Sequence, residues 1–263
     1  MEVTINPKDF SNLLRCLSLL KNNCNDVEIR GGILRQRTNN RACIFEMDLT
    51  PLVSDCDLVL SNVKNKLSLL KTISKQEVKV CITDNDISFS GERSTFKFAM
   101  PRPDFLDNKF LSGEDFARIF TLREEDVILE YAVTKDISSL MKVTSGQFKI
   151  VSFQISLEGA TAAIIATTTD KKQYSRIEQG IPIKKPLKCF SNIVVEPFLI
   201  DHDGDILFKM YNVQDTICID TFETSIGKIT IKVYCRSQLI EELELDNSEP
   251  NAEQSPDAIN TGD

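Results

Sequence analysis

The sequence contains a single histidine, His202, and none of its eight cysteines forms a C-x-x-C pair. A zinc site built from spaced Cys and His ligands is therefore excluded. The motifs G-x-x-x-x-G-K-[ST], G-x-G-x-x-G and G-x-S-x-G are also absent, which argues against a nucleotide-dependent enzyme or a serine hydrolase. No repeated acidic motif supplies the carboxylates of a metal-dependent nuclease or phosphatase. We expect that this protein is not an enzyme and that it binds no cofactor.

The acidic run Asp201–Asp205 has some features of a cation-binding loop. Counted from Asp201, however, its glycine is not at the sixth position, and Asn212 stands at the twelfth position, where a calcium loop needs glutamate. We interpret this run as a polar turn.

Long apolar runs are missing as well. No stretch approaches the roughly 20 apolar residues that span a bilayer, and the first residues lack the basic and apolar regions of a secretory signal. Most cysteines lie in apolar stretches such as Val78–Ile82, as small core residues do in proteins of a reducing compartment. We expect an intracellular, soluble protein that does not bind membranes.

The acidic charge is concentrated at one end of the chain. The formal net charge is −8, and residues 241–263 contain eight acidic residues without a lysine or arginine. Residues 1–240 are therefore neutral, with 31 acidic and 31 basic residues. A neutral body can still carry a strongly basic face. The final segment is polar and contains two prolines, so we expect it to be disordered.

The two halves of the chain share a repeated phrase. Lys8–Leu14 reads almost the same as Lys135–Met141, at an offset of 127 residues, and at this offset Arg15 falls on Lys142. Gly32 falls on Gly159 in the same way. We predict an N-terminal domain over residues 1–100, a connector over 101–126, a second domain over 127–240 and a tail over 241–263.

Apolar periodicity predicts two helices in each half. The helices are expected at residues 7–21, 61–74, 135–144 and 191–199, each among many strands. In the second half, strands at 149–157 and 161–167 are expected to pair around Gly159. The pattern is typical of an α+β fold in which helices cover one side of antiparallel sheets.

Cations recur on the expected outward faces of these helices. If Phe10 and Leu14 face the core, Lys8 and Arg15 point away from it, and Lys135 and Lys142 repeat this geometry with Ile137, Leu140 and Met141 inward. A second stripe comprises Lys64, Lys71 and Lys75. Solubility alone explains lysines on a single helix, but cations kept in both copies favour a face that contacts the phosphates of duplex DNA.

With these features, the sequence resembles the DNA sliding clamps of the proliferating cell nuclear antigen (PCNA) type, and most of all the shorter clamps of phages. The segments Ile87–Phe98 and Val133–Lys142 carry the likeness, together with the duplication. The resemblance implies two tandem clamp domains, with antiparallel sheets outside and two helices per domain on the inner face. It also implies a homotrimeric ring around duplex DNA that serves a DNA polymerase and is placed by a clamp loader. If a phage encodes it, it acts in the host cytoplasm.

The resemblance also assigns residues. The hole would be lined by Lys8, Arg15, Lys64, Lys71, Lys75, Lys135 and Lys142. A groove for partner peptides, next to the connector, would be formed by Ile44, Phe105, Leu106, Phe110, Leu111, Tyr234 and Leu239. These apolar residues would alternatively just hold the connector in place. Ring closure would use edge strands, for which we expect residues 77–83 and 161–167.

A second interpretation remains open. The chain would then be a clamp-shaped protein that forms no replicative ring: a monomeric polymerase accessory factor, a checkpoint-clamp subunit or a viral transcription factor. Oligomeric state and retention on circular DNA distinguish these alternatives. We expect the acidic tail to repel DNA from the outer surface.

Overall fold

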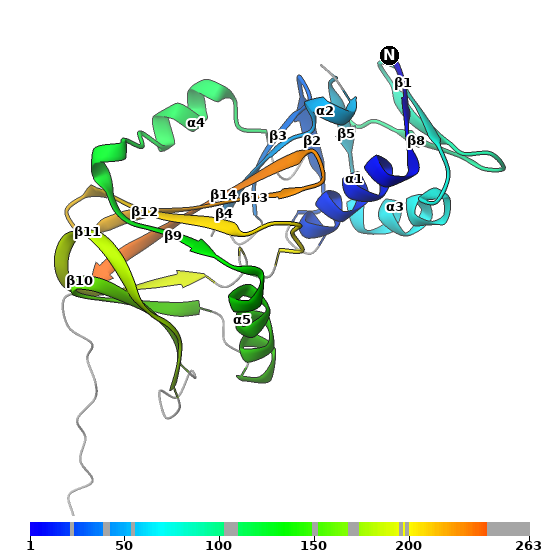
Figure 1. Cartoon of the computed structure of the whole chain (residues 1–263). Coiled ribbons are helices and arrows are strands. Elements are labelled where there is room, and N and C mark those ends of the chain that lie inside the picture. Colours follow the sequence, from blue (N-terminus) through cyan, green and yellow to red (C-terminus); the bar gives the residue numbers. More distant parts are fainter. Residues whose placement is uncertain are drawn as a thin grey trace, which may run out of the picture.

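A computed structural model of the protein describes residues 1–21, 24–38, 43–53, 56–102, 110–148, 152–167, 174–194, 197 and 200–240. Antiparallel strands dominate it, and a few helices pack on their faces (Figure 1). Among these residues, no helix has both the length and the apolar character needed to cross a membrane.

Three of the four helices that the apolar spacing predicts are present: α1 (Pro7–Leu20), α3 (Val63–Leu70) and α5 (Lys135–Phe148). Helix α1 begins with Pro7 in its first turn, and the side chain of Asn6 caps it by accepting the amide of Asp9 at 2.9 Å. Helix α3 continues into a 3₁₀ turn, η1 (Lys71–Ile73), and packs beside α1. The other helical segments are α2 (Thr50–Val53), α4 (Gly113–Ile119) and η3 (Glu124–Asp126).

The strands form two antiparallel sheets. A four-stranded sheet has the order β1-β6-β7-β8, and a ten-stranded sheet has the order β10-β11-β9-β12-β13-β14-β4-β3-β2-β5. The strands are β1 (Glu2–Ile5), β2 (Val27–Arg30), β3 (Ile33–Arg37), β4 (Cys43–Asp48), β5 (Leu58–Leu60), β6 (Val78–Ile82), β7 (Asp86–Ser90), β8 (Thr95–Ala99), β9 (Val127–Val133), β10 (Ser152–Thr167), β11 (Tyr174–Val194), β12 (Ile206–Gln214), β13 (Ile217–Ile226) and β14 (Ile229–Ile240).

The large sheet takes strands from both halves of the chain. Strand β14 pairs with β4, in a register that runs from Thr230 opposite Asp48 to Cys235 opposite Cys43. We call this β4–β14 ladder the seam. Through it, β2 to β5 of the first half and β9 to β14 of the second half share one hydrogen-bonded sheet. The seam therefore holds the two halves of the chain together.

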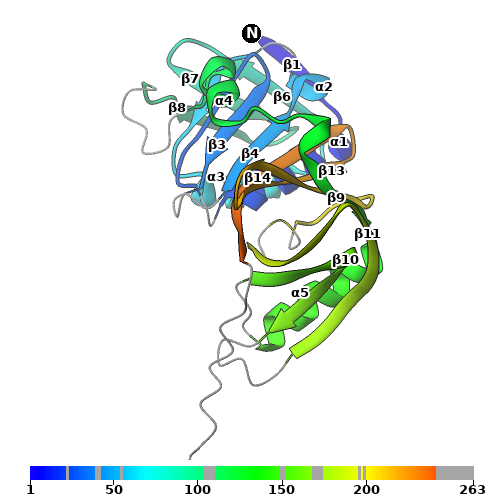
Figure 2. The ribbon, with the colours of Figure 1, turned by 90° about the vertical axis from the view of Figure 1, so that its left-hand side faces the viewer.

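The two faces of this sheet carry different helices. Along β14, Val233 is buried on the side that α1 covers, whereas the neighbouring Tyr234 contacts Phe116 of α4. Adjacent residues of a strand point to opposite faces, so α1 and α4 lie on opposite sides of the sheet. Figure 2 shows α4 in front of β3 and β4, with α1 behind them.

Two predictions in the second half are wrong. Ser191–Val194 does not begin a helix but ends β11, where Ile155 of β10 pairs with Ser191. The alternation of buried Ser191 and Ile193 with more exposed Asn192 fits a strand, and strand pairing overrides the weak helical pattern. Residues 195, 196, 198 and 199 lie outside the described part of the chain.

Nor do residues 149–157 and 161–167 pair around Gly159. They belong largely to one strand, β10, which pairs with β11 on both sides of this glycine. Gly159 has a φ of +62° and lies beside a register shift, so it bends the strand and does not reverse it. In the first half, Gly32 has a φ of +73° and does lie in a turn, between β2 and β3.

Of the two segments expected to be edge strands, one is internal to its sheet and the other lies at an edge. Residues 78–82 form β6, which lies between β1 and β7, so the expectation that this segment is an edge is wrong. Residues 161–167 belong to β10, which is the terminal strand of the large sheet. The edges of the small sheet are β1 and β8.

Candidate nucleic-acid interface and partner groove

Five of the seven cations assigned to DNA are exposed to solvent. They are Lys8 on α1, Lys64 on α3, Lys71 on η1, Lys75 just beyond η1, and Lys135 on α5. No ion pair joins any of them to another residue of the described chain. Each is therefore available to an anionic partner. Apolar residues on the other side of α1 and α3, such as Phe10, Leu14 and Leu67, are buried as the sequence predicts.

The remaining two cations, Arg15 and Lys142, are held by contacts within the chain. Arg15 lies 3.1 Å from Asp201 and 2.9 Å from Asp203. Lys142 donates a hydrogen bond to the backbone carbonyl of Ile200 at 3.0 Å. Both residues therefore bind the segment 200–205, which packs between α1 of the first half and α5 of the second.

Segment 200–205 connects α1 to α5 through its hydrogen bonds. His202 is buried, with Nε2 at 3.0 Å from the hydroxyl of Ser138 and Nδ1 bonded to the carbonyl of Gly204. Asp203 also accepts the amide of Gly227 at 2.7 Å. The hydrogen bond from Arg15, followed by that from Gly227, lowers the pKa of Asp203.

These contacts explain the acidic run that resembled a cation loop. Its carboxylates Asp201 and Asp203 pair with a guanidinium. Within the part of the chain that the structure describes, no group of acidic, histidine or cysteine residues is arranged to hold a metal ion.

The rotation of α5 differs from the helical-wheel prediction. Leu140 was expected to face inward but is 47% exposed, whereas Met141 is fully buried. Ser138, Thr144 and Ser145 are buried on the same side as Met141. His202 explains the difference, because its hydrogen bond with Ser138 allows a polar residue on the packed face. Leu140 and Val143 are left on the exposed side.

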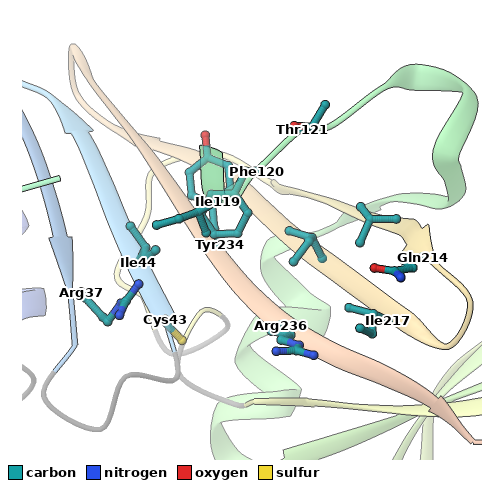
Figure 3. A pocket seen from close by; sticks show the side chains of 12 residues that line it. Arg37, Cys43, Ile44, Ile119, Phe120, Thr121, Gln214, Ile217, Tyr234 and Arg236 are labelled. Atoms are coloured by element: carbon teal, nitrogen blue, oxygen red, sulfur yellow. The ribbon is translucent and has the colours of Figure 1, made fainter. Parts of the chain in front are cut away.

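A groove of about 530 Å³ lies on the other face of the large sheet, beside the seam (Figure 3). Ile44 and Tyr234, both predicted for the partner groove, line it together with Ile119 and Phe120 from the end of α4. In Figure 3, Ile119 and Phe120 lie against Tyr234, with Ile44 beside them. The other lining residues are Arg37, Cys43, Thr121, Val213, Gln214, Ile217, Ile219 and Arg236.

Aromatic contacts position the wall of the groove. Ser112 caps the N-terminus of α4, since its hydroxyl accepts the amide of Asp115 at 3.1 Å. The rings of Phe116 and Phe120 lie 4.8 and 5.1 Å from that of Tyr234, and 5.0 Å from each other. Such ring pairs stabilise beyond the area they bury. They fix α4 on the sheet and define one side of the groove.

Phe110 and Leu111, also predicted for the groove, lie elsewhere. Phe110 bridges to Gln36, donates its amide to Glu28 at 3.2 Å and lies 5.1 Å under the guanidinium of Arg30. The backbone amide of Leu111 donates a hydrogen bond to the backbone carbonyl of Arg35 on β3, at 3.0 Å. These two residues fix the connector, as the alternative interpretation proposed.

Leu239 is buried and does not line the groove, while Phe105 and Leu106 lie outside the described residues. The lining residues from the end of α4 and from β12 and β13 were not predicted from the sequence. The spacing of Phe116 and Phe120 by four residues was a signal for α4 as an amphipathic helix.

The groove also carries positive charge. Arg37 and Arg236 line it, and neither forms an ion pair with another described residue. Figure 3 shows Arg236 near Ile217 and Arg37 beyond Ile44. The groove thus combines an apolar floor with two arginines, which suits a peptide that has apolar anchors and acidic neighbours.

Comparisons with known proteins bear on the fold. No family model matches the sequence, and no curated protein matches it either. Solved structures do match. The chain is similar to A. fulgidus PCNA in its structure with the C-terminal region of FEN-1, at a TM-score of 0.59 and 11% identity, covering 92% of this chain and 99% of that chain.

Two further solved structures are similar to the chain over most of its length. A chain of the PCNA2–PCNA3 complex from Sulfolobus tokodaii matches with a TM-score of 0.62 and 9% identity, over 92% of this chain and 100% of that chain. PCNA from Entamoeba histolytica matches with a TM-score of 0.59 and 11% identity, over 90% and 98%. At such identities the likeness concerns the fold, and it confirms the predicted fold class: an α+β, two-domain fold of the PCNA sliding-clamp type.

Proposed function

We propose that this protein is a DNA sliding clamp, a processivity factor that encircles duplex DNA and tethers a DNA polymerase. The observation that carries the proposal is the set of exposed, unpaired lysines on α1, α3, η1 and α5, in a fold shared with PCNA. Within this class we favour the phage type, on the likeness of residues 87–98 and 133–142 alone.

The mechanism follows from charge and topology. Lysines neutralise phosphates without reading bases, so the contact is independent of sequence. In a closed ring the DNA is retained because the chain surrounds it, so individual contacts can be weak and exchange during sliding. This reconciles a net charge of −8 with a DNA-binding role, because the acidic excess lies in residues 241–263.

We propose a homotrimer as the ring. Its closure would use edge strands left open in the monomer, with β8 of one subunit beside β10 of the next. Light scattering across a dilution series tests this directly. We expect a mass of three times 29.7 kDa at high concentration, whereas a monomer at every concentration contradicts the homotrimer.

Retention on DNA tests the ring itself. The protein is diluted to monomer and concentrated again in the presence of a nicked circular duplex. A ring stays on the circle in high salt and is released when the circle is cut. A non-ring accessory factor, the alternative function, leaves circular and linear DNA equally fast as salt rises.

The lysines are tested by a matched pair of variants. Lys8→Gln with Lys135→Gln removes two equivalent cations of the two halves, and Lys232→Gln removes one from β14, on the face that carries Tyr234. On linear duplex, each lost phosphate contact makes the slope of log affinity against log salt shallower by about 0.9. We expect this change for the double variant only. An equal effect of Lys232→Gln would place the DNA elsewhere.

We also propose that the groove binds an apolar peptide from a polymerase or clamp loader. The A. fulgidus relative was solved with a peptide from FEN-1, which supports a peptide-binding role for this fold. Ile44→Glu places a charge on the apolar floor and should abolish capture of the cognate polymerase while the native mass stays unchanged. Polymerase capture that survives this substitution would exclude the groove.

A further inference from the structure

Two cysteines from opposite halves of the chain meet at the seam. The sulfur of Cys43 on β4 lies 3.0 Å from the sulfur of Cys235 on β14. The two residues are separated by 192 positions in sequence and are both 2% exposed. They are directly opposite each other in the register of the seam. Strand pairing therefore holds the two thiols together, independently of the tail and the connector.

The backbone around Cys43 shows which kind of pair this is. Its amide donates to the hydroxyl of Thr38 at 3.1 Å, and its carbonyl accepts the amide of Thr38 at 2.9 Å. Both backbone groups thus point toward β3 and away from β14. Cys43 and Cys235 form a non-hydrogen-bonded pair, in which opposite α-carbons lie about 4.5 Å apart and side chains come closest. A disulfide spans α-carbon separations from about 4.4 to 6.8 Å.

The pair is buried beside the groove. Cys43 borders the groove of about 530 Å³, but its side chain and that of Cys235 belong to the core on the opposite face of the sheet from Ile44 and Tyr234. Hydrogen peroxide is small and reaches the two sulfurs when the seam opens locally.

We propose that Cys43 and Cys235 are a redox modification site, which a peroxide converts to a disulfide that covalently joins the two halves of the chain. The thiolate of Cys43 attacks hydrogen peroxide, takes one oxygen to become a sulfenic acid, and one water molecule leaves after protonation. The thiol of Cys235 then attacks this sulfur, forming the S–S bond and releasing a second water. The two sulfurs together lose two electrons to the peroxide, and a thiol reductant reverses the change.

The bond would act on the seam and on the groove. Ile44 and Tyr234, the next opposed pair of the ladder, both line the groove. A covalent link one residue away restricts separation of β4 and β14, and closing a loop of this length constrains the unfolded chain strongly. We expect oxidation to raise the melting temperature. This inference concerns the chain alone and holds whether or not the chain forms a DNA-encircling ring.

The experiment uses the full-length chain treated with hydrogen peroxide and then alkylated. Intact mass should show the loss of two hydrogens, and peptide mapping should find the Cys43 peptide linked to the Cys235 peptide. Melting temperature should rise by several degrees and return after dithiothreitol. Cys81→Ala is the matched control, because Cys81 on β6 is partly exposed and lies away from the seam.

The variants decide the outcome. In Cys43→Ala and in Cys235→Ala, the linked peptide and the rise in melting temperature should disappear, and in Cys81→Ala both should remain. Each reduced variant is first compared with the reduced wild type, so a folding defect is seen separately. The proposal is overturned if the wild type forms no intramolecular link, if the link joins other cysteines, or if Cys43→Ala keeps the shift.

Discussion

Replacing Asp220 by asparagine should change how the stability of this protein depends on pH. Asp220 lies on β13, fully buried, with Met210 and Cys235 opposite it on the neighbouring strands. Neither carboxylate oxygen has a hydrogen-bond partner among the described residues. Burial raises the pKa of Asp220 from 3.8 to about 7. The nearby Ser237 hydroxyl opposes this rise in part, although no hydrogen bond of ordinary geometry joins the two.

The sign and size follow from proton linkage. Between pH 3.8 and about 7 the native carboxyl keeps its proton while the unfolded one has lost it. The native state then binds more protons, so the free energy of unfolding falls as pH rises through this window and is level above it. A pKa difference of about three corresponds to roughly 4 kcal/mol, at about 1.36 kcal/mol for each pKa unit.

Asparagine has nearly the same shape and does not titrate. Its buried amide costs about 1–3 kcal/mol if unpaired, but this cost does not vary with pH. The stability of Asp220→Asn relative to wild type should therefore rise by roughly 4 kcal/mol between pH 4 and pH 8. Urea unfolding at several pH values measures this difference directly.

A second aspartate supplies the control. Lys97 donates a hydrogen bond that lowers the pKa of Asp86 below 3.8, so the pH-dependent part of its contribution to stability is confined to acidic pH and is fully present above the unfolded pKa. Between pH 5 and pH 8 the stability of Asp86→Asn relative to wild type should therefore stay constant, whereas that of Asp220→Asn should rise. If Asp220→Asn and wild type keep a constant difference from pH 4 to pH 8, the reasoning about Asp220 is refuted.

Two further predictions concern the contacts of the helices. Arg15→Gln removes both ion pairs to segment 200–205 and should lower the free energy of unfolding by about 1 kcal/mol, because the pairs are partly exposed, whereas Lys8→Gln should change it by less than about 0.5. Equal effects in denaturant unfolding would contradict the anchoring of Arg15. Leu140→Gln should change stability by less than about 0.5 kcal/mol while Met141→Ala costs about 2–5, and the reverse order would mean that α5 is rotated as the helical wheel predicts.

How far the sequence predicts this fold depends on the range of the interactions involved. Helices α1 and α3 follow from apolar spacing, because residues such as Phe10 and Leu67 bury the same face that the spacing indicates. The rotation of α5 does not follow from apolar spacing, because it depends on a hydrogen bond between Ser138 and His202, 64 positions away. The helix predicted at residues 191–199 is wrong for the same reason, since residues 191–194 are fixed in a strand by pairing with β10.

The groove illustrates the same limit. Ile44 and Tyr234 were predicted from the resemblance to sliding clamps, and both line the groove. Phe120 and Arg236 were missed because only the folded seam brings the end of α4, β4 and β14 together. The aromatic residues of the connector looked equivalent in sequence, yet Phe116 and Phe120 pack on Tyr234 whereas Phe110 packs under Arg30. Periodicity does not distinguish these partners.

The duplication itself now has two explanations that differ by position. Arg15 and Lys142 are equivalent in the two halves, and both bind segment 200–205, so a cation is retained there for anchoring within the chain. Lys8 and Lys135 are equivalent as well, but both are exposed and neither forms an ion pair among the described residues. No internal contact explains their retention. Among the repeated cations, Lys8 and Lys135 therefore support a phosphate-binding face, and the double variant at these two positions tests that role most directly.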